Sequence, residues 1–170
     1  MHTFSMAVNQ SRQQNELYYA TNRYLNSEME NLAMARKIAN GYKALGHLFR
    51  NVPTAPQTIE LQKISGPYRG EFYKLAPYVK NFLIHGSFAT NDTAPGFSDL
   101  DTFVILKKEI CLDFQKLSQL RQKVSSVKKL LLEIDPLAHH GFIFCAEQNL
   151  DYYPQHYLPI AVFRYAKNLY

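Results

Sequence analysis

The 170-residue chain has no tryptophan, only two cysteines and no long apolar run. Cys111 and Cys145 form no Cys-x-x-Cys pair, so we expect no zinc site built from thiolates. The most apolar runs, 82–84 and 103–106, are far too short to cross a membrane. No basic segment followed by an apolar stretch opens the chain, so we expect no signal peptide and a cytoplasmic protein with reduced thiols.

Glycine and proline are also scarce, at 7 and 8 residues, which excludes collagen-like and low-complexity classes. Hydrophobic residues make up 46% and charged residues 19%, a balance that excludes a disordered chain. The length suits one compact domain, or a domain with a helical arm. The net charge of +5 favours anionic partners such as nucleotides or nucleic acid only weakly, because an ordinary solvated surface often carries such a surplus.

The first part of the chain is predicted to be a long helical arm. Between residues 11 and 50, apolar residues recur mostly three, four or seven apart and form one stripe. These residues are Tyr18, Leu25, Met29, Leu32, Tyr42, Leu45 and Phe49. Gly41 and Gly46 mark a possible bend, and prolines and glycines break the chain over 51–70. We therefore predict an N-terminal helical arm and connector over 1–70, suited to packing or oligomerisation, and a core over 71–170.

The core begins with two short apolar runs, 81–85 and 98–106, which predict strands. A polar loop over 88–97 separates them. The clearest helix covers 108–134, where apolar residues keep a spacing of three or four, and its basic residues, Arg121 among them, are expected to face solvent.

The last elements are a third strand over 140–145, apolar on both faces, and a helix over 160–170. The chain ends there without a cap or breaker, so we expect that it could be a fragment of a longer protein.

Two acidic residues at the start of the second strand carry the chemistry. Asp99 and Asp101 are two residues apart, which on a strand places both carboxylates on one face. Two adjacent anions need a compensating cation, and hard oxygen ligands suit Mg²⁺ or Mn²⁺. Gly86 and Ser87 follow the first strand, where glycine allows close approach of a ligand and the hydroxyl can hold phosphate oxygens. The residues alone therefore predict a metal–nucleotide site.

These two segments resemble the signature of the polymerase-β-type nucleotidyltransferase superfamily. The signature joins an apolar strand, Gly-Ser and a small residue to a variable loop and then Ser-Asp-x-Asp. Here the match is Ile84-His85-Gly86-Ser87-Phe88-Ala89, followed by Gly96-Phe97-Ser98-Asp99-Leu100-Asp101. The order of the following helix and strand extends the resemblance to roughly 81–146.

The resemblance implies an α+β fold, with a small mixed sheet flanked by helices. It also implies an enzyme that moves an NMP group from an NTP to a hydroxyl of a protein, a small molecule or a nucleic acid. Gly86, Ser87 and Ser98 would then bind the nucleotide, and Asp99 and Asp101 would bind the metal.

The chain departs from the family at the third carboxylate, which relatives carry on the next core strand. His139 and His140 stand there instead. A histidine, His140 by slight preference, could serve as ligand or base. Alternatively Asp135, Glu147 or Asp151 reaches in, or the site binds nucleotide without catalysis.

Two further hypotheses therefore stay open. One is a catalytically weak nucleotide-binding or regulatory module, for example in a toxin–antitoxin or defence system. The other is a helical partner-binding protein in which the two acidic residues are incidental. His85 is interpreted as structural, and a tyrosine-rich stretch over 152–157 as a plug on the side of the sheet.

Overall fold

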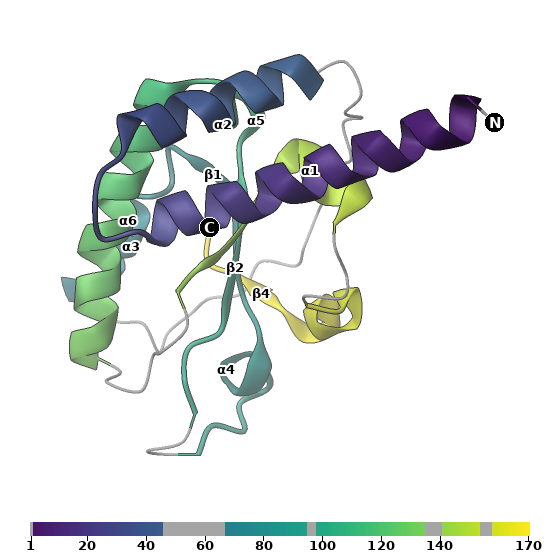
Figure 1. The fold of residues 1–170 in the computed structure, drawn as a ribbon. Helices are drawn as coiled ribbons and strands as arrows, with labels where there is room; N and C mark the ends of the chain where they lie inside the picture. The colour runs from purple at the N-terminus through teal and green to yellow at the C-terminus, as the bar shows by residue number, and fades with distance from the viewer. Residues whose placement is uncertain (1, 46–66, 95–97, 135–140, 154–157) are drawn as a thin grey trace.

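The computed structural model describes residues 2–45, 67–94, 98–134, 141–153 and 158–170 (Figure 1). The elements in chain order are α1 (His2–Asn26), α2 (Leu32–Leu45), α3 (Pro67–Tyr73), β1 (Val79–Ile84), α4 (Gly86–Thr90), β2 (Thr102–Leu106), α5 (Lys108–Cys111), α6 (Phe114–Ile134), β3 (Ile143–Ala146), the 3-10 helices η2 (Glu147–Tyr152) and η3 (Ile160–Tyr165), and β4 (Lys167–Asn168). In these described ranges no helix is both long and apolar enough to cross a membrane.

The strands form one mixed sheet in the order β3-β2-β1-β4. β1 pairs antiparallel with β2 and with β4, whereas β2 and β3 are parallel. The strand sequences Val-Lys-Asn-Phe-Leu-Ile and Thr-Phe-Val-Ile-Leu are rich in the apolar, β-branched and aromatic residues that suit a buried sheet. The predicted α+β class, with a small mixed sheet flanked by helices, is confirmed.

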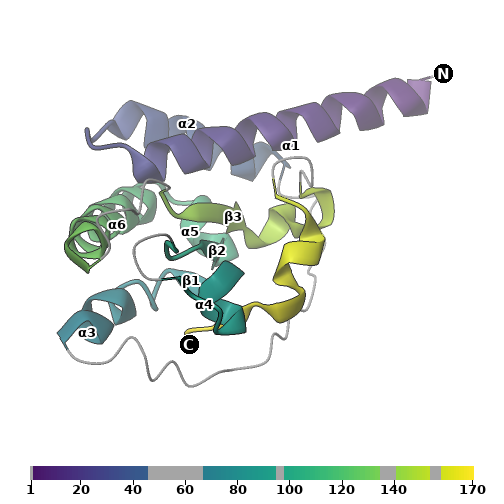
Figure 2. The same ribbon diagram turned by 90° about the horizontal axis from the view of Figure 1, so that it is seen from below.

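One face of the sheet carries the larger core. Phe82, Val104 and Phe144 point to this face and are fully buried. They pack with apolar residues of α6, among them Leu120 and Val124, which recur every three or four residues along the helix. Figure 2 shows the strands stacked between α6 on one side and the C-terminal segment, drawn in yellow, on the other.

The opposite face has a smaller core. Leu83, Phe103, Ile105 and Cys145 are buried there together with Tyr18 of α1. Partly buried residues from η2, η3 and the segments next to them complete the layer: Leu150, Tyr153, Leu158, Phe163 and Ala166. The predicted burial of the third strand on both faces is therefore confirmed, because Phe144 belongs to the first core and Cys145 to the second.

Helix α1 covers the outer edge of β3 through two asparagines one turn apart. The Asn22 side chain accepts a hydrogen bond from the Phe144 N–H at 2.7 Å and donates to the Phe144 carbonyl at 2.6 Å. Asn26 donates to the Phe142 carbonyl at 2.8 Å. Side-chain amides thus satisfy backbone groups that an exposed strand edge would leave unpaired.

The second half of α1 and most of α2 share the core of the sheet. Leu25 of α1 and Ile38 and Tyr42 of α2 belong to the same cluster as Phe82 and Val104. The predicted connector falls largely on residues outside the described ranges.

The prediction of one helix over 11–50 is wrong, because the chain turns between α1 and α2. The Ser27 hydroxyl accepts from the Met29 N–H at 3.2 Å, and Asn31 caps α2 by accepting from the Met34 N–H at 3.1 Å. Met29 and Leu32, expected on the apolar stripe, are 80% and 48% exposed.

Two further elements and one side chain differ from the prediction. The helix expected over 108–134 is two helices, since Asp113 caps α6 by accepting from the N–H groups of Gln115 and Lys116 at 2.9 and 3.2 Å. The expected C-terminal helix is instead η3 followed by β4, which completes the sheet. Arg121, expected in solvent, is buried and donates to the Ser27 carbonyl at 3.0 Å, tying α6 to the α1–α2 turn.

Candidate functional site

The candidate site lies where β1 turns into α4. Gly86 adopts φ +65°, in the left-handed region, and a Cβ built on it would lie 2.4 Å from Asp101 Oδ2. Only glycine accommodates both this dihedral and this approach without strain. The structure therefore brings together the two halves of the sequence motif, which are separated by the loop over 88–97.

Asp101 is held next to this turn by the sheet. The His85 N–H donates to the Asp101 carbonyl at 3.1 Å, which continues the β1–β2 ladder one pair beyond Ile84 and Thr102. β2 itself begins at Thr102, so the predicted strand start at residue 98 is wrong, and Asp99 and Asp101 lie in the segment that leads into it. Both aspartates are half-buried.

His85 lies between these carboxylates and the C-terminal segment. Its side chain is buried, and its ring meets that of Phe163 edge-on at 5.7 Å. Burial lowers the pKa of His85, and the negative charges of Asp101 and Asp99 only partly offset this effect. Both carboxylates therefore lie close enough to the imidazole to act on its pKa. With its pKa lowered, the imidazole is neutral near pH 7.

The two serines of the motif lie on different elements. Ser87 is half-buried in the first turn of α4, and its carbonyl accepts from the Asp92 N–H at 3.1 Å. Ser98 closes the preceding loop, because its hydroxyl accepts from the Ala94 N–H at 2.8 Å while its own N–H donates to the Ala94 carbonyl at 3.0 Å. Ser98 thereby fixes the start of the segment that carries Asp99.

The donor set fits a hard divalent cation only in part. Among the described residues there is no group of three or more histidine, cysteine, aspartate or glutamate side chains that could hold a metal ion. Asp99 and Asp101 would supply two carboxylates, and Mg²⁺ characteristically binds through one or two carboxylates plus substrate phosphates and water. The pair therefore suits a metal that arrives with a nucleotide.

The described residue of the third strand that lies level with Asp101 is a glycine. β2 and β3 pair in parallel with Phe103 opposite Ile143, so two residues earlier Gly141 comes level with Asp101. A Cβ on Gly141 would lie 2.2 Å from Asn26 Oδ1, so a larger residue here would have to displace the α1 side chain that donates to the Phe142 carbonyl. His139, His140 and Asp135 lie outside the described residues.

Of the other acidic candidates, Glu147 is placed far from the site. It follows β3 at the end of the sheet opposite to Asp101 and forms an ion pair with Lys80, near the start of β1. The five residues of β2 separate the two ends by roughly 15 Å. Asp151 is exposed on η2, which begins at that same far end.

Two features of the site were missed by sequence reasoning. Phe163 covers the site face next to His85 and also packs on Phe103, with ring centroids 4.5 Å apart. Asn26 reaches the start of β3 from α1, a contact across 116 residues of sequence. No local sequence pattern predicts either contact. The interpretation that Tyr153 packs against the side of the sheet agrees with its ring contact to Phe103, with centroids 5.3 Å apart.

Comparisons with known proteins agree with the motif and its surroundings. Residues 68–146 match the family model of the nucleotidyltransferase domain, a stretch that runs from α3 through β3 and includes Gly86, Asp99 and Asp101. Searches of curated proteins and of solved structures each returned no match. The matched stretch contains the strand–turn–helix and the acidic segment on which the resemblance was based, and it identifies residues 68–146 as a nucleotidyltransferase domain, consistent with the polymerase-β-type superfamily.

Proposed function

We propose that this protein moves an NMP group from an NTP to a hydroxyl acceptor, using Mg²⁺ or Mn²⁺ held by Asp99 and Asp101. The observation that carries the proposal is the close approach of Asp101 to Gly86, where a Cβ would lie only 2.4 Å from Asp101 Oδ2. It joins a phosphate-binding turn to an acidic segment in one place, and the family match covers both. Neither half of the motif would be informative if the two lay apart.

The residues around the turn have distinct roles in this proposal. Gly86, Ser87 and Ser98 would hold and orient the nucleotide, the glycine by allowing close approach and the serines through their hydroxyl groups. Asp99 and Asp101 would hold the metal, which when bound neutralises charge on the phosphates and on the departing pyrophosphate. In the transfer, the acceptor oxygen bonds to the α-phosphorus as the bond to pyrophosphate breaks, and the hydroxyl proton passes to a base.

The proposal is tested with labelled NTPs and single carboxylate changes. We expect Mg²⁺-dependent thermal stabilisation by an NTP, and transfer of the label to an acceptor with release of pyrophosphate. Asp101→Asn and Asp99→Asn should each lower transfer by about 10²-fold or more, because each would remove a metal ligand. Asp92→Asn is the matched control, since Asp92 is exposed and its side chain accepts a hydrogen bond from Thr90 at the end of α4. Unchanged transfer in both Asp99 and Asp101 variants would refute the role assigned to them.

The base is proposed to be His140, and His139 is its alternative. Gly141, which lies level with Asp101, has no side chain and cannot be this base. His139→Ala and His140→Ala, measured separately across a pH range, should show which one matters. A wild-type rate and pH profile in both variants would remove histidine from the mechanism.

A second candidate is a nucleotide-binding module with little or no catalysis, serving a regulatory role such as in a toxin–antitoxin or defence system. Gly141 favours it, because the position level with Asp101 carries no carboxylate and a larger residue there would have to displace Asn26. This candidate predicts the same NTP- and Mg²⁺-dependent stabilisation without pyrophosphate release for any class of acceptor. Absence of nucleotide binding at millimolar Mg²⁺ would instead count against both candidates and favour a helical partner-binding role.

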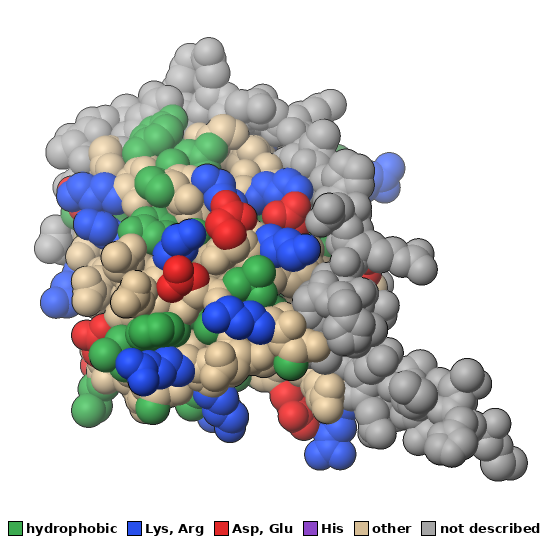
Figure 3. All heavy atoms as spheres, turned by 90° about the horizontal axis from the view of Figure 1, so that it is seen from above, with side chains coloured by type: hydrophobic (Ala, Val, Ile, Leu, Met, Phe, Trp, Pro, Cys, Tyr) green, Lys and Arg blue, Asp and Glu red, His purple; other side chains and the backbone are tan. Residues whose placement is uncertain are grey.

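The acceptor class is a separate question from the transfer itself. On the face seen from above, basic side chains are interspersed with acidic and apolar ones among the coloured, described residues (Figure 3). Nucleic acid binding depends on clustered positive charge that contacts successive phosphates. This face lies over α1 and α2, away from the candidate site, so the acceptor at the site is tested directly, by competition with polynucleotide at low and high salt.

A further inference from the structure

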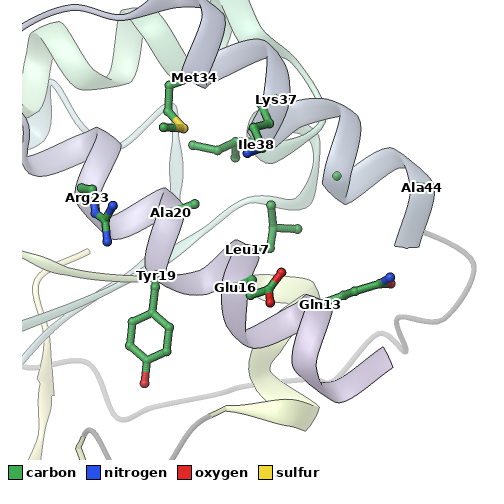
Figure 4. Close-up of a pocket in the computed structure, with 11 residues that line it drawn as sticks. Gln13, Glu16, Leu17, Tyr19, Ala20, Arg23, Met34, Lys37, Ile38 and Ala44 are labelled. Atoms are coloured by element: carbon green, nitrogen blue, oxygen red, sulfur yellow. The ribbon is translucent and has the colours of Figure 1, made fainter. Parts of the chain in front are cut away.

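Helices α1 and α2 leave an apolar groove on the outer side of the molecule, away from the candidate site. The groove has a volume of about 610 Å³. Leu17 and Ala20 of α1 and Met34 and Ile38 of α2 line it, as Figure 4 shows. Gly41 deepens its floor, because a Cβ at this position would lie 3.0 Å from Leu17 Cδ1.

Of the three charged residues that line this groove, Lys37 lies on α2, and the two on α1 are arranged symmetrically along that helix. Glu16 and Arg23 both line the groove and both are exposed. They are seven residues apart, two helical turns, so they lie on the same side of α1. Tyr19, 36% exposed, and Ala20 lie midway between them. Glu16 forms an ion pair with Arg12 on the same helix, but both side chains of that pair are largely exposed, so the pairing is weak.

This arrangement is self-complementary under a twofold axis. If a second α1 lies antiparallel to the first and the axis passes between residues 19 and 20, Glu16 faces Arg23 of the partner subunit. The same contact recurs on the other side of the axis, because an isologous interface repeats every pair. The small side chain of Ala20 at the centre permits the close approach of two helices.

The length of α1 supports the same arrangement. Figures 1 and 2 show the N-terminal part of α1 running past the end of α2 and away from the sheet. A helical stretch of about ten residues is marginally stable in water by itself. In the antiparallel arrangement this extension would pass over the partner's α1–α2 turn, where Met29 is 80% exposed. Both the extension and the turn would then be covered.

We propose that the α1–α2 groove is the dimer interface of this protein, and that it receives α1 of a second copy in antiparallel orientation. The inference does not depend on nucleotide transfer, because none of the groove residues belongs to the candidate site. It assigns the N-terminal helices a role in assembly in addition to covering the β3 edge.

The test is a charge exchange read by the mass in solution of the full chain. We expect the wild type to be a dimer at micromolar concentration in light scattering and sedimentation. Glu16→Lys and Arg23→Glu, each alone, place like charges opposite each other twice and should weaken dimerisation about tenfold or more. An equimolar mixture of the two variants should form a heterodimer, because each variant then meets its opposite charge. The double variant should dimerise with itself.

Lys43→Glu is the matched control, since Lys43 is exposed on α2 outside the groove and the change alters net charge equally. It should leave the dimer intact. A wild type that stays monomeric up to roughly 100 μM would overturn the proposal and leave the groove to another ligand. Single variants that dimerise like the wild type would overturn it too, as would a mixture that stays monomeric. Restoration in the mixture also excludes misfolding as the cause of the loss.

Discussion

The two faces of the sheet differ in what covers them and in what they carry. On one face, Phe82, Val104 and Phe144 pack against the regular helices α1, α2, α3 and α6, in a core of 25 buried residues among those that the structure describes. On the other, the described residues include five buried ones: Tyr18 of α1 and four strand residues, which short 3-10 segments next to the chain end also cover. The polar groups of His85 and Asp101 stand at the margin of this face. The same strands thus carry the larger core on one side and the candidate site on the other.

This difference indicates how the fold divides its tasks. Continuous apolar packing stabilises roughly in proportion to the buried area, whereas polar groups near a site are costly to bury. Placing the site on the thinly covered face leaves half-buried carboxylates accessible without opening the larger core. The comparison predicts that substitutions on the helix-covered face lower the free energy of unfolding most, and that substitutions on the site face mainly change ligand binding.

The largest effect is expected from Phe144→Ala on the helix-covered face. Phe144 is fully buried, and removal of its ring leaves a cavity next to Phe142 and the β3 edge. The free energy of unfolding should fall by about 3–5 kcal/mol. Urea denaturation followed by circular dichroism measures this change, and Phe144→Leu, which keeps most of the apolar volume, should lose clearly less.

The next effect is expected from Gly86→Ala at the margin of the site face. The change forces a Cβ into the left-handed region and towards Asp101 Oδ2, at a cost of about 1–2 kcal/mol. Nucleotide-dependent stabilisation should disappear at the same time, because either the turn or the carboxylate must move. Gly70→Ala is the control, since nothing lies within 4 Å of a Cβ there and it stands in helix α3. If the Gly86→Ala variant binds nucleotide as well as the Gly70→Ala control and the wild type do, the contact between the turn and the Asp101 carboxylate is not part of the site.

Features of the two faces that depend on local sequence patterns could be predicted, whereas those that depend on contacts between distant residues could not. Strand identity, the burial of the third strand on both sides and the link between Gly86 and Asp101 follow from local pattern and a family motif. The turn between α1 and α2 was missed because helical spacing continues through Met29 and Leu32, although both are exposed. Only the hydroxyl and amide groups of Ser27 and Asn31 mark the interruption.

The cover of the site face was less predictable, because it depends on long-range contacts. The 160–170 segment has enough apolar residues for a helix. Its last residues instead form β4, which pairs antiparallel with β1, and the Leu169 N–H donates to the Phe82 carbonyl at 2.8 Å. Sheet pairing in this case outweighs helix propensity. The close approach of Asn26 to Gly141 likewise joins two ends of the sequence that no short motif connects.

A smaller effect is expected from Phe163→Ala, which thins the cover of the site face. Phe163 is half-buried, so the loss should be about 1–2 kcal/mol, below that of Phe144→Ala. The same change exposes His85, and its pKa should rise towards the ordinary value of about 6.5. Urea denaturation and an NMR titration of the His85 ring measure the two results. A loss of unfolding free energy equal to that of Phe144→Ala would show that the two faces contribute alike to stability and would contradict the difference proposed between them.

The smallest effect concerns the pH dependence of stability through His85. Because burial lowers the folded-state pKa of this residue, the unfolded chain binds its proton more readily. Stability should therefore fall as the pH drops below about 6.5, and this contribution should level off once the pH is below the folded-state pKa. His85→Gln lacks the titrating group, so the difference in unfolding free energy between wild type and variant, measured from pH 8 to pH 5, isolates it from the carboxylates. A difference that does not change with pH would mean that the imidazole titrates alike in both states, and that the thin cover of the site face excludes too little water to keep His85 neutral.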